Sequence, residues 1–464
     1  MLKNLIKKLI PKSVLLLYHK LLAIAANIRY GFPSRKMIVI GVTGTKGKSS
    51  TCVMITRILE EAGFKVGSTN TIFFKIEDKE WPNTTKQGMP GRLKLQKMLR
   101  KMAHSGCTHA VIEVTSEGIL QSRQWGIAFD VCVFTNLGEE HIESHGSYEK
   151  YIKAKELIFK NLCKTYRKRT SSLISFPRGY SGQALIKVEK GEEKVKKVII
   201  ANMDDPFAER FLHHRADEKW AVSITPNKDI KACEDRHYKC VCADEVKLVL
   251  DGIVLSVLGH YIDIHLHGKF MAENALLSIA VARSIGVSMS ICESALEKIT
   301  LMPGRTEIIT SKSGTRVIID YAHEPKSFNA IFETAKTMNA NAKGKIIAVF
   351  GSPGGGRDIG KRPKMGAIAG KYSDLIILTT DDAYDDDPEQ IAKDIQSGIS
   401  KSKQIEIIID RTKAIQHALK TASSNDIVLL LGKGSEQTMA VKGGKYIPWS
   451  DRGMVEDVLK KKKY

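Results

Sequence analysis

The stretch that decides the fold is Ile38-Val39-Ile40-Gly41-Val42-Thr43-Gly44-Thr45-Lys46-Gly47-Lys48-Ser49-Ser50-Thr51. A run rich in β-branched residues ends in a glycine-rich turn, and Lys-Ser follows ahead of a segment, Cys52 to Ala62, that is predicted to be helical. A strand, a glycine loop and a helix in this order gather backbone N–H groups and a helix N-terminus around an anion. The sequence therefore predicts a phosphate-binding loop, whose candidate nucleotide-binding residues are Gly44, Thr45, Lys46, Gly47, Lys48, Ser49 and Ser50.

Two side chains of this loop carry the expected chemistry. Lys48 is expected to reach the outer phosphates of a nucleotide, and the hydroxyl of Ser49 to ligate its Mg²⁺. The spacing differs from the ordinary P-loop, because Val42 stands five residues before Gly47. A glycine-rich turn without a ligand is the alternative. The order of strand, loop, lysine, hydroxyl and helix favours phosphate binding.

The length and composition of the chain indicate its class of protein. The chain has 464 residues, of which 43% are hydrophobic, so it is globular and long enough for several domains. Its eight cysteines are scattered among apolar segments, as is typical of a reducing compartment. Cys233, His237, Cys240 and Cys242 lie close together, but no second pair at zinc-finger spacing follows. Incidental clustering is therefore the favoured interpretation.

The net charge of +21 indicates anionic partners. The lysines are spread along the chain and no basic, aromatic-containing module appears, so nucleic acid is not the expected partner. A nucleotide and an acidic substrate, together with a membrane surface, account for the charge.

The first 36 residues leave two interpretations open. Apolar residues recur at helical spacing between lysines up to Ile10, Pro11 interrupts, and Val14 to Ile28 is mostly apolar. The run is too short and too charged to span a bilayer, and no signal-peptide cleavage site stands out. Residues 1–30 are expected to form either a basic amphipathic helix on the inner membrane face or a helix packed on its own domain.

The next elements predict a doubly wound sheet. Ala110 to Val114 is a buried strand, and the carboxylate of Glu113 is costly there unless it is paired or binds a metal. Glu113 is therefore a candidate Mg²⁺ ligand facing Ser49. A further strand, Asp130 to Phe134, runs into a polar tail that reaches His141. Alternating strands and helices predict a mostly parallel sheet that binds ligands at the carboxyl ends of its strands.

The remaining chain predicts a second α/β sheet. Residues 164–197 are expected to be an exposed excursion, and residues 221–267 a small antiparallel addition. Five strands are predicted beyond Arg305, in residues 316–320, 345–350, 375–380, 405–409 and 427–431. The expected fold class is α/β, with a short N-terminal helical segment (1–36), a central P-loop-type, mostly parallel sheet domain (37–303) and a C-terminal Rossmann-like domain (304–464).

Several motifs in combination carry a family resemblance over residues 37–455. They are Gly41-Val-Thr-Gly-Thr-Lys-Gly-Lys-Ser49, Glu113-Val-Thr-Ser-Glu-Gly118, Thr135-Asn-Leu-Gly-Glu-Glu-His141, Pro303-Gly-Arg305-x-Glu307, Asp320-Tyr-Ala-His323 and Gly432-Lys-Gly-x-Glu436. The chain resembles the Mur ligase family, most of all the branch that adds the third amino acid of the peptidoglycan stem.

The resemblance implies a reaction. ATP would phosphorylate a muramoyl-peptide carboxylate, and an amino acid would displace the phosphate to form an amide, in the cytoplasm and as a monomer. ATP and Mg²⁺ would be the cofactors, and two domains would close on them. The rivals are a folylpolyglutamate-type ligase and a nucleotide-binding, membrane-associated scaffold without catalysis.

The resemblance also implies site residues. Lys48, His141, Lys155 and Arg305 would be catalytic, and Glu113 and His141 would serve the metals. Lys155 would be carbamylated to ligate a second Mg²⁺; a solvated helix lysine is the alternative. The nucleotide would also contact Asn274, whose alternative role is a helix N-cap, together with Arg305, Asp320 and His323. The muramoyl peptide would contact Asn83, Thr84, Thr85, Ser116, Gln121 and Arg123.

The loop from Thr380 to Pro388 stands where the family binds the incoming amino acid. Diaminopimelate-adding members carry Asp-Asn-Pro-Arg there, but here Tyr384 replaces the arginine, among five aspartates that include Asp381 and Asp382. This predicts lysine or a similar diamino acid, unless the acids only form a solvated turn. Gly432 and Glu436 would hold the substrate amine.

The sequence departs from the family pattern in several places. Lys46, Glu117, Glu140, Met271 and Ser435 replace the usual residues of the motifs. Only 36 residues precede the phosphate loop, where the family carries a UDP-binding domain. A lipid-linked acceptor is therefore expected beside a UDP-linked one.

Overall fold

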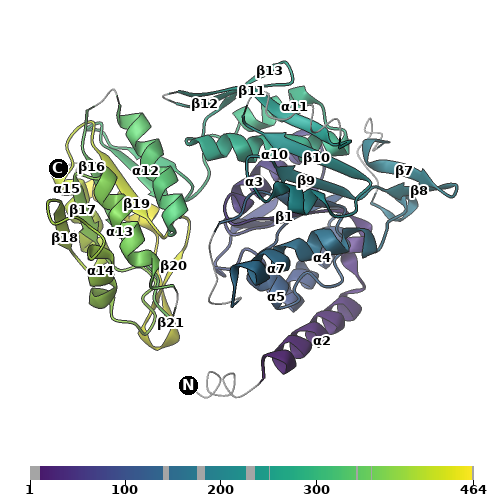
Figure 1. The fold of residues 1–464 in the computed structure, drawn as a ribbon, viewed down its shortest axis with the longest axis horizontal. Helices are drawn as coiled ribbons and strands as arrows, with labels where there is room; N and C mark the ends of the chain where they lie inside the picture. Colours follow the sequence, from purple (N-terminus) through teal and green to yellow (C-terminus); the bar gives the residue numbers. More distant parts are fainter. Residues whose placement is uncertain are drawn as a thin grey trace. The chain divides into compact units, whose positions relative to one another are not determined.

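The computed structural model describes residues 11–138, 146–174, 183–225, 236–249, 251–340, 343–356 and 358–461. The chain divides into two compact units (Figure 1). The first contains residues up to Lys247 together with Val254–Ile264 and Met271–Ile299. The second contains Leu248–Ile253, His265–Phe270 and the residues from Thr300 onward.

The larger sheet has eleven strands among the described residues, in the order β13-β12-β11-β10-β9-β6-β1-β5-β2-β3-β4. Its strands are β1 (Ile38–Thr43), β2 (Val66–Thr69), β3 (Phe73–Ile76), β4 (Lys79–Pro82), β5 (His109–Glu113), β6 (Val131–Phe134), β9 (Val198–Asn202), β10 (Glu218–Ser223), β11 (Lys239–Val249), β12 (Gly252–Val257) and β13 (His260–Ile264). The central strands are parallel, with Val42 beside Glu113 and Thr43 beside Phe134. The carboxyl ends of β1, β5 and β6 therefore meet at one edge.

Helices cover both faces of this sheet, and its central strands are therefore fully buried. The helices are α3 (Lys48–Glu61), α4 (Arg92–His104), α5 (Ser116–Leu120), α7 (Tyr148–Asn161), α8 (Ala208–Leu212), α10 (Lys269–Ile285) and α11 (Met289–Glu297). A separate hairpin joins β7 (Ile186–Glu189) to β8 (Glu192–Val195).

Helix α2 (Lys12–Tyr30) precedes the sheet and ends at Gly31, whose φ of 68° is the left-handed conformation common after a helix. The helix packs against α4 and buries Ala23, Ala26 and Asn27, whereas Val14, Leu17 and Leu21 nearer its N-terminus are exposed. The expected helical run before Pro11 lies outside the described residues. Within the described part of the chain, no helix is long and apolar enough to cross a membrane.

The second unit contains a six-stranded sheet of described residues in the order β14-β15-β19-β16-β17-β18. β14 is antiparallel to β15 and the other pairings are parallel. Its two faces bury separate apolar clusters. The strands are β14 (Glu307–Thr310), β15 (Arg316–Asp320), β16 (Ile346–Phe350), β17 (Leu375–Leu378), β18 (Gln404–Ile407) and β19 (Ile427–Leu431), with a hairpin of β20 (Thr438–Val441) and β21 (Lys445–Pro448). The helices are α12 (Pro325–Asn339), α13 (Lys361–Tyr372), α14 (Pro388–Gln396), α15 (Arg411–Thr421) and α16 (Asp451–Lys461). The predicted α/β fold class is confirmed.

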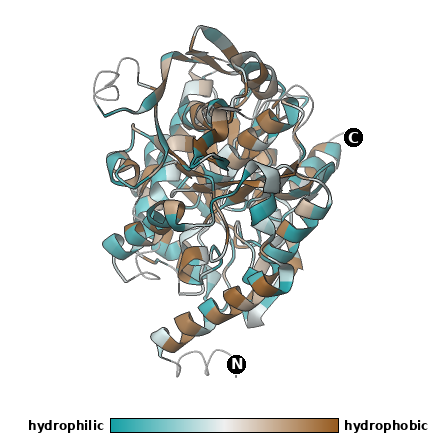
Figure 2. Cartoon of the chain, turned by 90° about the vertical axis from the view of Figure 1, so that its right-hand side faces the viewer, coloured by the Kyte–Doolittle hydropathy of each residue, from teal (hydrophilic) through white to brown (hydrophobic). Residues whose placement is uncertain are grey.

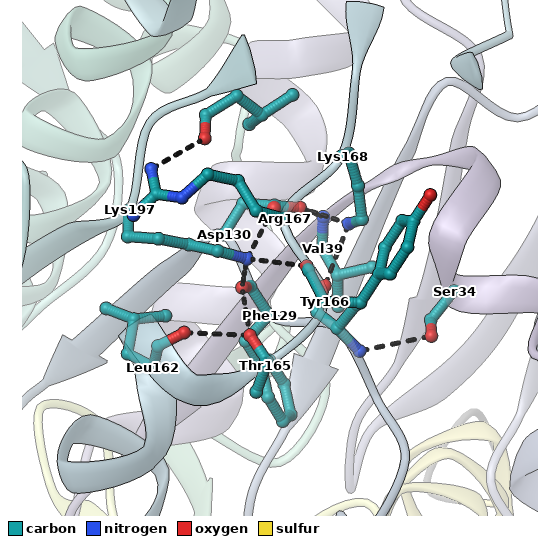
Figure 3. Close-up of polar contacts among 12 residues, drawn as sticks. Ser34, Val39, Phe129, Asp130, Leu162, Thr165, Tyr166, Arg167, Lys168 and Lys197 are labelled. Atoms are coloured by element: carbon teal, nitrogen blue, oxygen red, sulfur yellow. Dashed lines mark hydrogen bonds and ion pairs between the residues drawn. The ribbon is translucent and has the colours of Figure 1, made fainter. Parts of the chain in front are cut away.

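A buried ionic cluster lies where β6 and β9 begin (Figure 3). Asp130 Oδ1 lies 3.1 Å from Lys197 Nζ, and its Oδ2 pairs with Lys168 and accepts a 2.9 Å hydrogen bond from Val39 N. All three charged side chains are fully buried. The prediction of an exposed excursion over residues 164–197 is thus wrong near both of its ends, because Lys168 and Lys197 are buried and pair with Asp130, the residue directly before β6.

Candidate functional site

The phosphate loop is fixed by the polar segment that follows β6. Thr45 N donates to Asn136 O (2.8 Å), and Lys46 N donates to Asn136 Oδ1 (2.8 Å). Gly44 has a φ of 154°, and a Cβ there would lie 1.9 Å from Thr135 Oγ1. The loop therefore requires glycine at this position, because no side chain fits between the two segments.

The residues expected to bind phosphate and metal meet at the start of α3. Lys48 Nζ donates to Thr45 O (2.8 Å) across the loop, and Ser49 Oγ donates to Glu113 Oε2 (2.9 Å). Thr71 donates to the same oxygen through its N (2.7 Å) and its Oγ1 (2.9 Å). Glu113 is 2% exposed, so the strand delivers a buried carboxylate to the hydroxyl as the sequence predicts. Hydroxyl and carboxylate oxygens are the ligands that Mg²⁺ prefers.

Lys155 contacts the phosphate loop from helix α7. Its Nζ donates to Gly44 O (2.6 Å) and lies 4.6 Å from the centroid of the Tyr151 ring. Tyr151 in turn hydrogen-bonds Thr45 Oγ1 through its hydroxyl (2.9 Å). Lys155 is 2% exposed, so it is not the solvated helix lysine of the alternative interpretation. His141, the other expected metal residue, lies outside the described residues.

Asn274 contacts the phosphate loop from α10. Thr51 Oγ1 donates to its Oδ1 (3.2 Å), and a Cβ at Gly47 would lie 2.3 Å from the same atom. Because α10 begins at Lys269, Asn274 lies inside the helix, and the alternative role as an N-cap is wrong. Its amide instead fills the space that a glycine at position 47 leaves open.

The residues expected to hold the acceptor form a second group in the first unit. Arg123 donates through Nη2 to Gln121 Oε1 (2.8 Å), and through Nη1 to Gln87 Oε1 (2.9 Å) and to Met89 O. Asn83 Nδ2 donates to Gln87 O (3.0 Å). Burial, followed by the nearby charge of Arg92, lowers the pKa of Arg123. This group therefore presents positive charge that an acidic acceptor would offset.

The other expected acceptor residues lie beside this group. Asn83 Oδ1 accepts hydrogen bonds from Thr85 N (2.9 Å) and Thr85 Oγ1 (2.6 Å), so Asn83 shapes its own loop. Thr84 is exposed between them. Ser116 is the buried first residue of α5.

In the second unit, the expected nucleotide residues gather where β15 ends. Asp320 accepts hydrogen bonds from Thr306 N (2.7 Å) and Ala322 N (2.7 Å). His323 Nδ1 lies 2.7 Å from Tyr321 O, and the guanidinium of Arg305 stacks 4.5 Å from the centroid of the Tyr321 ring. The His323 ring also meets the Tyr321 ring edge-on, with centroids 4.7 Å apart, so Arg305 and His323 both contact this aromatic side chain.

A buried lysine organises the expected amino-acid site. Lys433 Nζ lies 2.8 Å from Asp382 Oδ1, 2.5 Å from Glu436 Oε2 and 3.7 Å from Asp381 Oδ1. Burial alone would lower the pKa of Lys433, but these three carboxylates raise it well above its usual value. Gly432 has a φ of 106°, and a Cβ there would lie 2.5 Å from Asp381 Oδ2.

One carboxylate oxygen of this cluster has no hydrogen-bond donor among the described residues. Asp381 Oδ2 is buried and accepts no hydrogen bond from the described residues. A buried acceptor without a donor is rare, because it loses its hydrogen bonds to water without replacement. An ammonium group would satisfy it.

The other acids of this loop have partners within the unit. Asp385 Oδ1 accepts from Gly443 N (2.8 Å), Asp386 Oδ2 from Gly355 N (3.1 Å) and Asp387 Oδ1 from Glu389 N (3.1 Å). Tyr384 has a φ of 53°, and a Cβ at Gly355 would lie 3.0 Å from its ring.

Sequence reasoning missed several residues that build these sites: Thr71, Gln87, Tyr151, Arg411 and Lys433. Arg411 is fully buried and pairs with Asp451 at 2.6 Å. Lys433 had a signal, because it lies inside the Gly-Lys-Gly motif. The others act through contacts distant in sequence and leave no local pattern.

The fold and the phosphate loop together define a nucleotide-binding α/β protein of two units. Residues 42–169 match the family model of the Mur ligase middle domain, and residues 304–434 match that of the Mur ligase glutamate ligase domain. The chain belongs to the Mur ligase family, whose members are ATP-dependent amide ligases. The expected family is confirmed, and with it the assignment as an enzyme.

Named relatives agree with this. The UDP-N-acetylmuramoyl-L-alanyl-D-glutamate–2,6-diaminopimelate ligase of Clostridium tetani is 34% identical over 446 residues, covering 95% of this chain and 81% of the relative. The UDP-N-acetylmuramyl-tripeptide synthetase of Roseiflexus sp. is 34% identical over 445 residues, covering 93% and 80%.

Solved structures share the fold. A UDP-N-acetylmuramoyl-L-alanyl-D-glutamate–2,6-diaminopimelate ligase is 26% identical with a TM-score of 0.57, covering 92% of this chain and 79% of that one. The folylpolyglutamate synthase of Mycobacterium tuberculosis has a TM-score of 0.60 but 15% identity, covering 93% and 94%. It shows a common fold, whereas the diaminopimelate ligases share sequence as well.

Proposed function

We propose that the protein adds a diamino acid to the carboxylate of a muramoyl peptide at the expense of ATP, in the synthesis of peptidoglycan precursors. The observation that carries the proposal is the contact of Ser49 with the buried Glu113 beside Lys48, at the edge where the central strands end. Residues 37–303 would bind ATP and the acceptor, and residues 304–464 the incoming amino acid. The names of the relatives support the acceptor class.

The residues of the first unit fit this chemistry. Lys48 would hold the transferred phosphoryl group and offset its charge. Ser49 and Glu113 would hold Mg²⁺, which supplies positive charge against the phosphates. Lys155 would serve as a carbamate that ligates a second ion; mass spectrometry of the intact protein in bicarbonate buffer detects that modification. Gln121 and Arg123 would orient the acceptor, and Asn274 would contact the nucleotide.

In the second unit, Asp320, His323 and Arg305 would contact the nucleotide, while Asp381 and Glu436 would receive the amine. The unsatisfied Asp381 Oδ2 supports this. For the amino acid we favour lysine, because Tyr384 stands where diaminopimelate-adding members carry arginine. Diaminopimelate is the second candidate, because the relatives are named for it.

Phosphate release with purified enzyme tests the proposal. ATP, Mg²⁺ and a muramoyl-L-alanyl-D-glutamate acceptor, either UDP-linked or lipid-linked, are combined with lysine or diaminopimelate. We expect release only with all components present, and loss of both release and product in K48A. Product formation undiminished in K48A would refute the proposal, and a large preference for diaminopimelate would refute lysine.

We also propose that the enzyme works as a monomer at the inner face of the membrane, in contact with it through residues 1–30. The exposed apolar half of α2 supports this contact.

A further inference from the structure

Helices α2 and α4 are distant in sequence, and neither carries an acidic residue. The chain contains no Asp or Glu in residues 1–59, and none in residues 81–112. The first 36 residues are rich in basic side chains, namely Lys3, Lys7, Lys8, Lys12, Lys20, Arg29, Arg35 and Lys36. Helix α4 adds Arg92, Lys94, Lys97, Arg100 and Lys101.

Large apolar side chains are exposed among these charges. Val14, Leu17, Tyr18 and Leu21 occupy positions i, i+3, i+4 and i+7 of α2 and are 52%, 57%, 55% and 57% exposed. This spacing places them on one face of the helix. Leu93, at the start of α4, is 53% exposed. Figure 2 shows hydrophobic residues along α2 toward its N-terminal end. Such an apolar stripe is unusual on a protein surface that faces only water.

The two helices form one surface, which we call the α2–α4 surface. They pack on each other, and Arg100 Nη1 donates to Tyr30 O (3.2 Å). The surface adjoins the proposed acceptor group, because Arg92 Nε donates to Gln121 O (2.9 Å). Burial lowers the pKa of Arg92, and the charge of Tyr18 acts in the opposite direction.

We propose that the α2–α4 surface docks on an anionic lipid bilayer, with the α2 stripe at the acyl boundary and the lysines of both helices at the headgroups. This builds on the membrane contact proposed for residues 1–30, and adds α4 and the charge of the lipid. Anionic lipid complements both features at once, because an interfacial helix needs an apolar face and flanking lysines and arginines. A protein partner with surface residues of both charges would be expected to pair its basic residues with acidic residues on α2 and α4, and these helices carry none.

Sedimentation of the full-length protein with vesicles tests the proposal. Vesicles of phosphatidylcholine alone are compared with vesicles that also contain phosphatidylglycerol, at low and at physiological salt. The basic variant is K20Q/K97Q/K101Q, and the apolar variant is L17S/L21S; all five side chains are exposed. The matched control, K401Q/K420Q/K442Q, removes the same charge from exposed positions of the second unit.

We expect binding to the anionic vesicles only, weakened by salt. A basic side chain at an anionic surface contributes about fivefold in affinity, so the basic variant should bind roughly 100-fold more weakly. The control triple should bind like the wild type, and L17S/L21S should also lose affinity. Equal loss in the control triple, or no binding at low salt, would overturn the proposal.

Two further readouts separate the alternatives. If light scattering shows a dimer that L17S/L21S dissociates without weakening vesicle binding, the surface joins two copies of the chain and the proposal is wrong. Phosphate release without vesicles should be unchanged in every variant. Its absence in the wild type would contradict the proposed function, and not the docking.

Discussion

Replacement of Asp130 by asparagine should destabilise the first unit far more than replacement of Lys168 by methionine. In the wild type two buried ammonium groups share one buried carboxylate (Figure 3). Asparagine leaves both cations without a counter-charge, which typically costs about 3–5 kcal/mol. Methionine at position 168 leaves a balanced pair of Asp130 and Lys197, so we expect a cost of about 1 kcal/mol at pH 7.

The smaller cost of K168M follows from two opposing effects. Burial, offset in part by Asp130, lowers the pKa of Lys168 from 10.5 to about 8. Keeping this lysine charged below pH 8 therefore costs about 3 kcal/mol relative to a solvated lysine, and methionine removes that cost. Against this, Met37 O and Ala128 O lose the hydrogen bonds of 2.6 and 2.8 Å that Lys168 donates.

Because of Lys168, the difference in stability between the wild type and K168M depends on pH. Between pH 8 and 10.5 the folded protein releases the Lys168 proton while the unfolded chain keeps it, so unfolding takes up a proton and stability rises with pH. K168M lacks this group. The stability of the wild type relative to K168M should therefore grow by about 3 kcal/mol from pH 7 to pH 10.5.

The assay is urea unfolding followed by tryptophan fluorescence in a W449F background. The remaining tryptophans, Trp81, Trp125 and Trp220, all lie in the first unit, so the signal reports that unit alone. A difference between wild type and K168M that stays constant from pH 7 to 10.5 would refute the reasoning. So would equal stability of D130N and the wild type at pH 7.

Three further predictions concern the two sites. G44A should abolish ATP binding measured by calorimetry, because its methyl group would meet Thr135 Oγ1, whereas G91A, where nothing lies within 4 Å of the added Cβ, should bind ATP normally. S49A should raise the Mg²⁺ concentration for half-maximal phosphate release by about 10- to 100-fold while S49T retains activity, since the hydroxyl contacts Glu113; equal Mg²⁺ dependence would contradict the metal assignment. K433M should destabilise the second unit by about 3–5 kcal/mol at neutral pH, as followed by the fluorescence of Trp449, because three carboxylates lose their cation; stability equal to that of the wild type would contradict this role of Lys433.

The fold and the contact of Ser49 with Glu113 at the phosphate loop could be predicted from the sequence, because both depend on patterns within short segments of the chain. Buried parallel strands read as β-branched runs, and polar residues at their ends mark the edge where ligands bind. This pattern alone places Ser49 opposite Glu113, and the two side chains are in contact in the folded chain. Lys155 was expected near the phosphate loop only through the family resemblance, since its helix is otherwise an ordinary amphipathic one.

Pairings between distant segments could not be predicted. Thr71 donates twice to Glu113 from the turn between β2 and β3, and nothing in its neighbourhood marks it. Lys168 and Lys197 looked like members of a solvated, lysine-rich stretch. Their burial depends on where β6 and β9 begin, which is a property of strand register and not of local charge.

The acidic loop shows how this limit affects substrate choice. In sequence, five aspartates around Tyr384 indicate a site for a cationic side chain. In the structure, Asp382 pairs with Lys433, and the three acids that follow Tyr384 accept backbone N–H groups of their own unit. Each of these acids thus has a partner within the unit, and among the buried carboxylate oxygens of this loop that the structure describes, Asp381 Oδ2 accepts no hydrogen bond.

If Asp381 Oδ2 receives the α-amino group, as we propose, it does not discriminate among the candidate amino acids, because every one of them carries that group. The choice between lysine and diaminopimelate would then depend on the far end of the substrate, and Tyr384, which stands where diaminopimelate-adding members carry arginine, is the residue that we propose to contact it. A guanidinium pairs with a second carboxylate in a bidentate manner, whereas a phenol offers one hydroxyl and no charge. Y384R should therefore shift the ratio of kcat/KM toward diaminopimelate by at least about tenfold if this position reads the substrate. An unchanged ratio would assign that role to another residue.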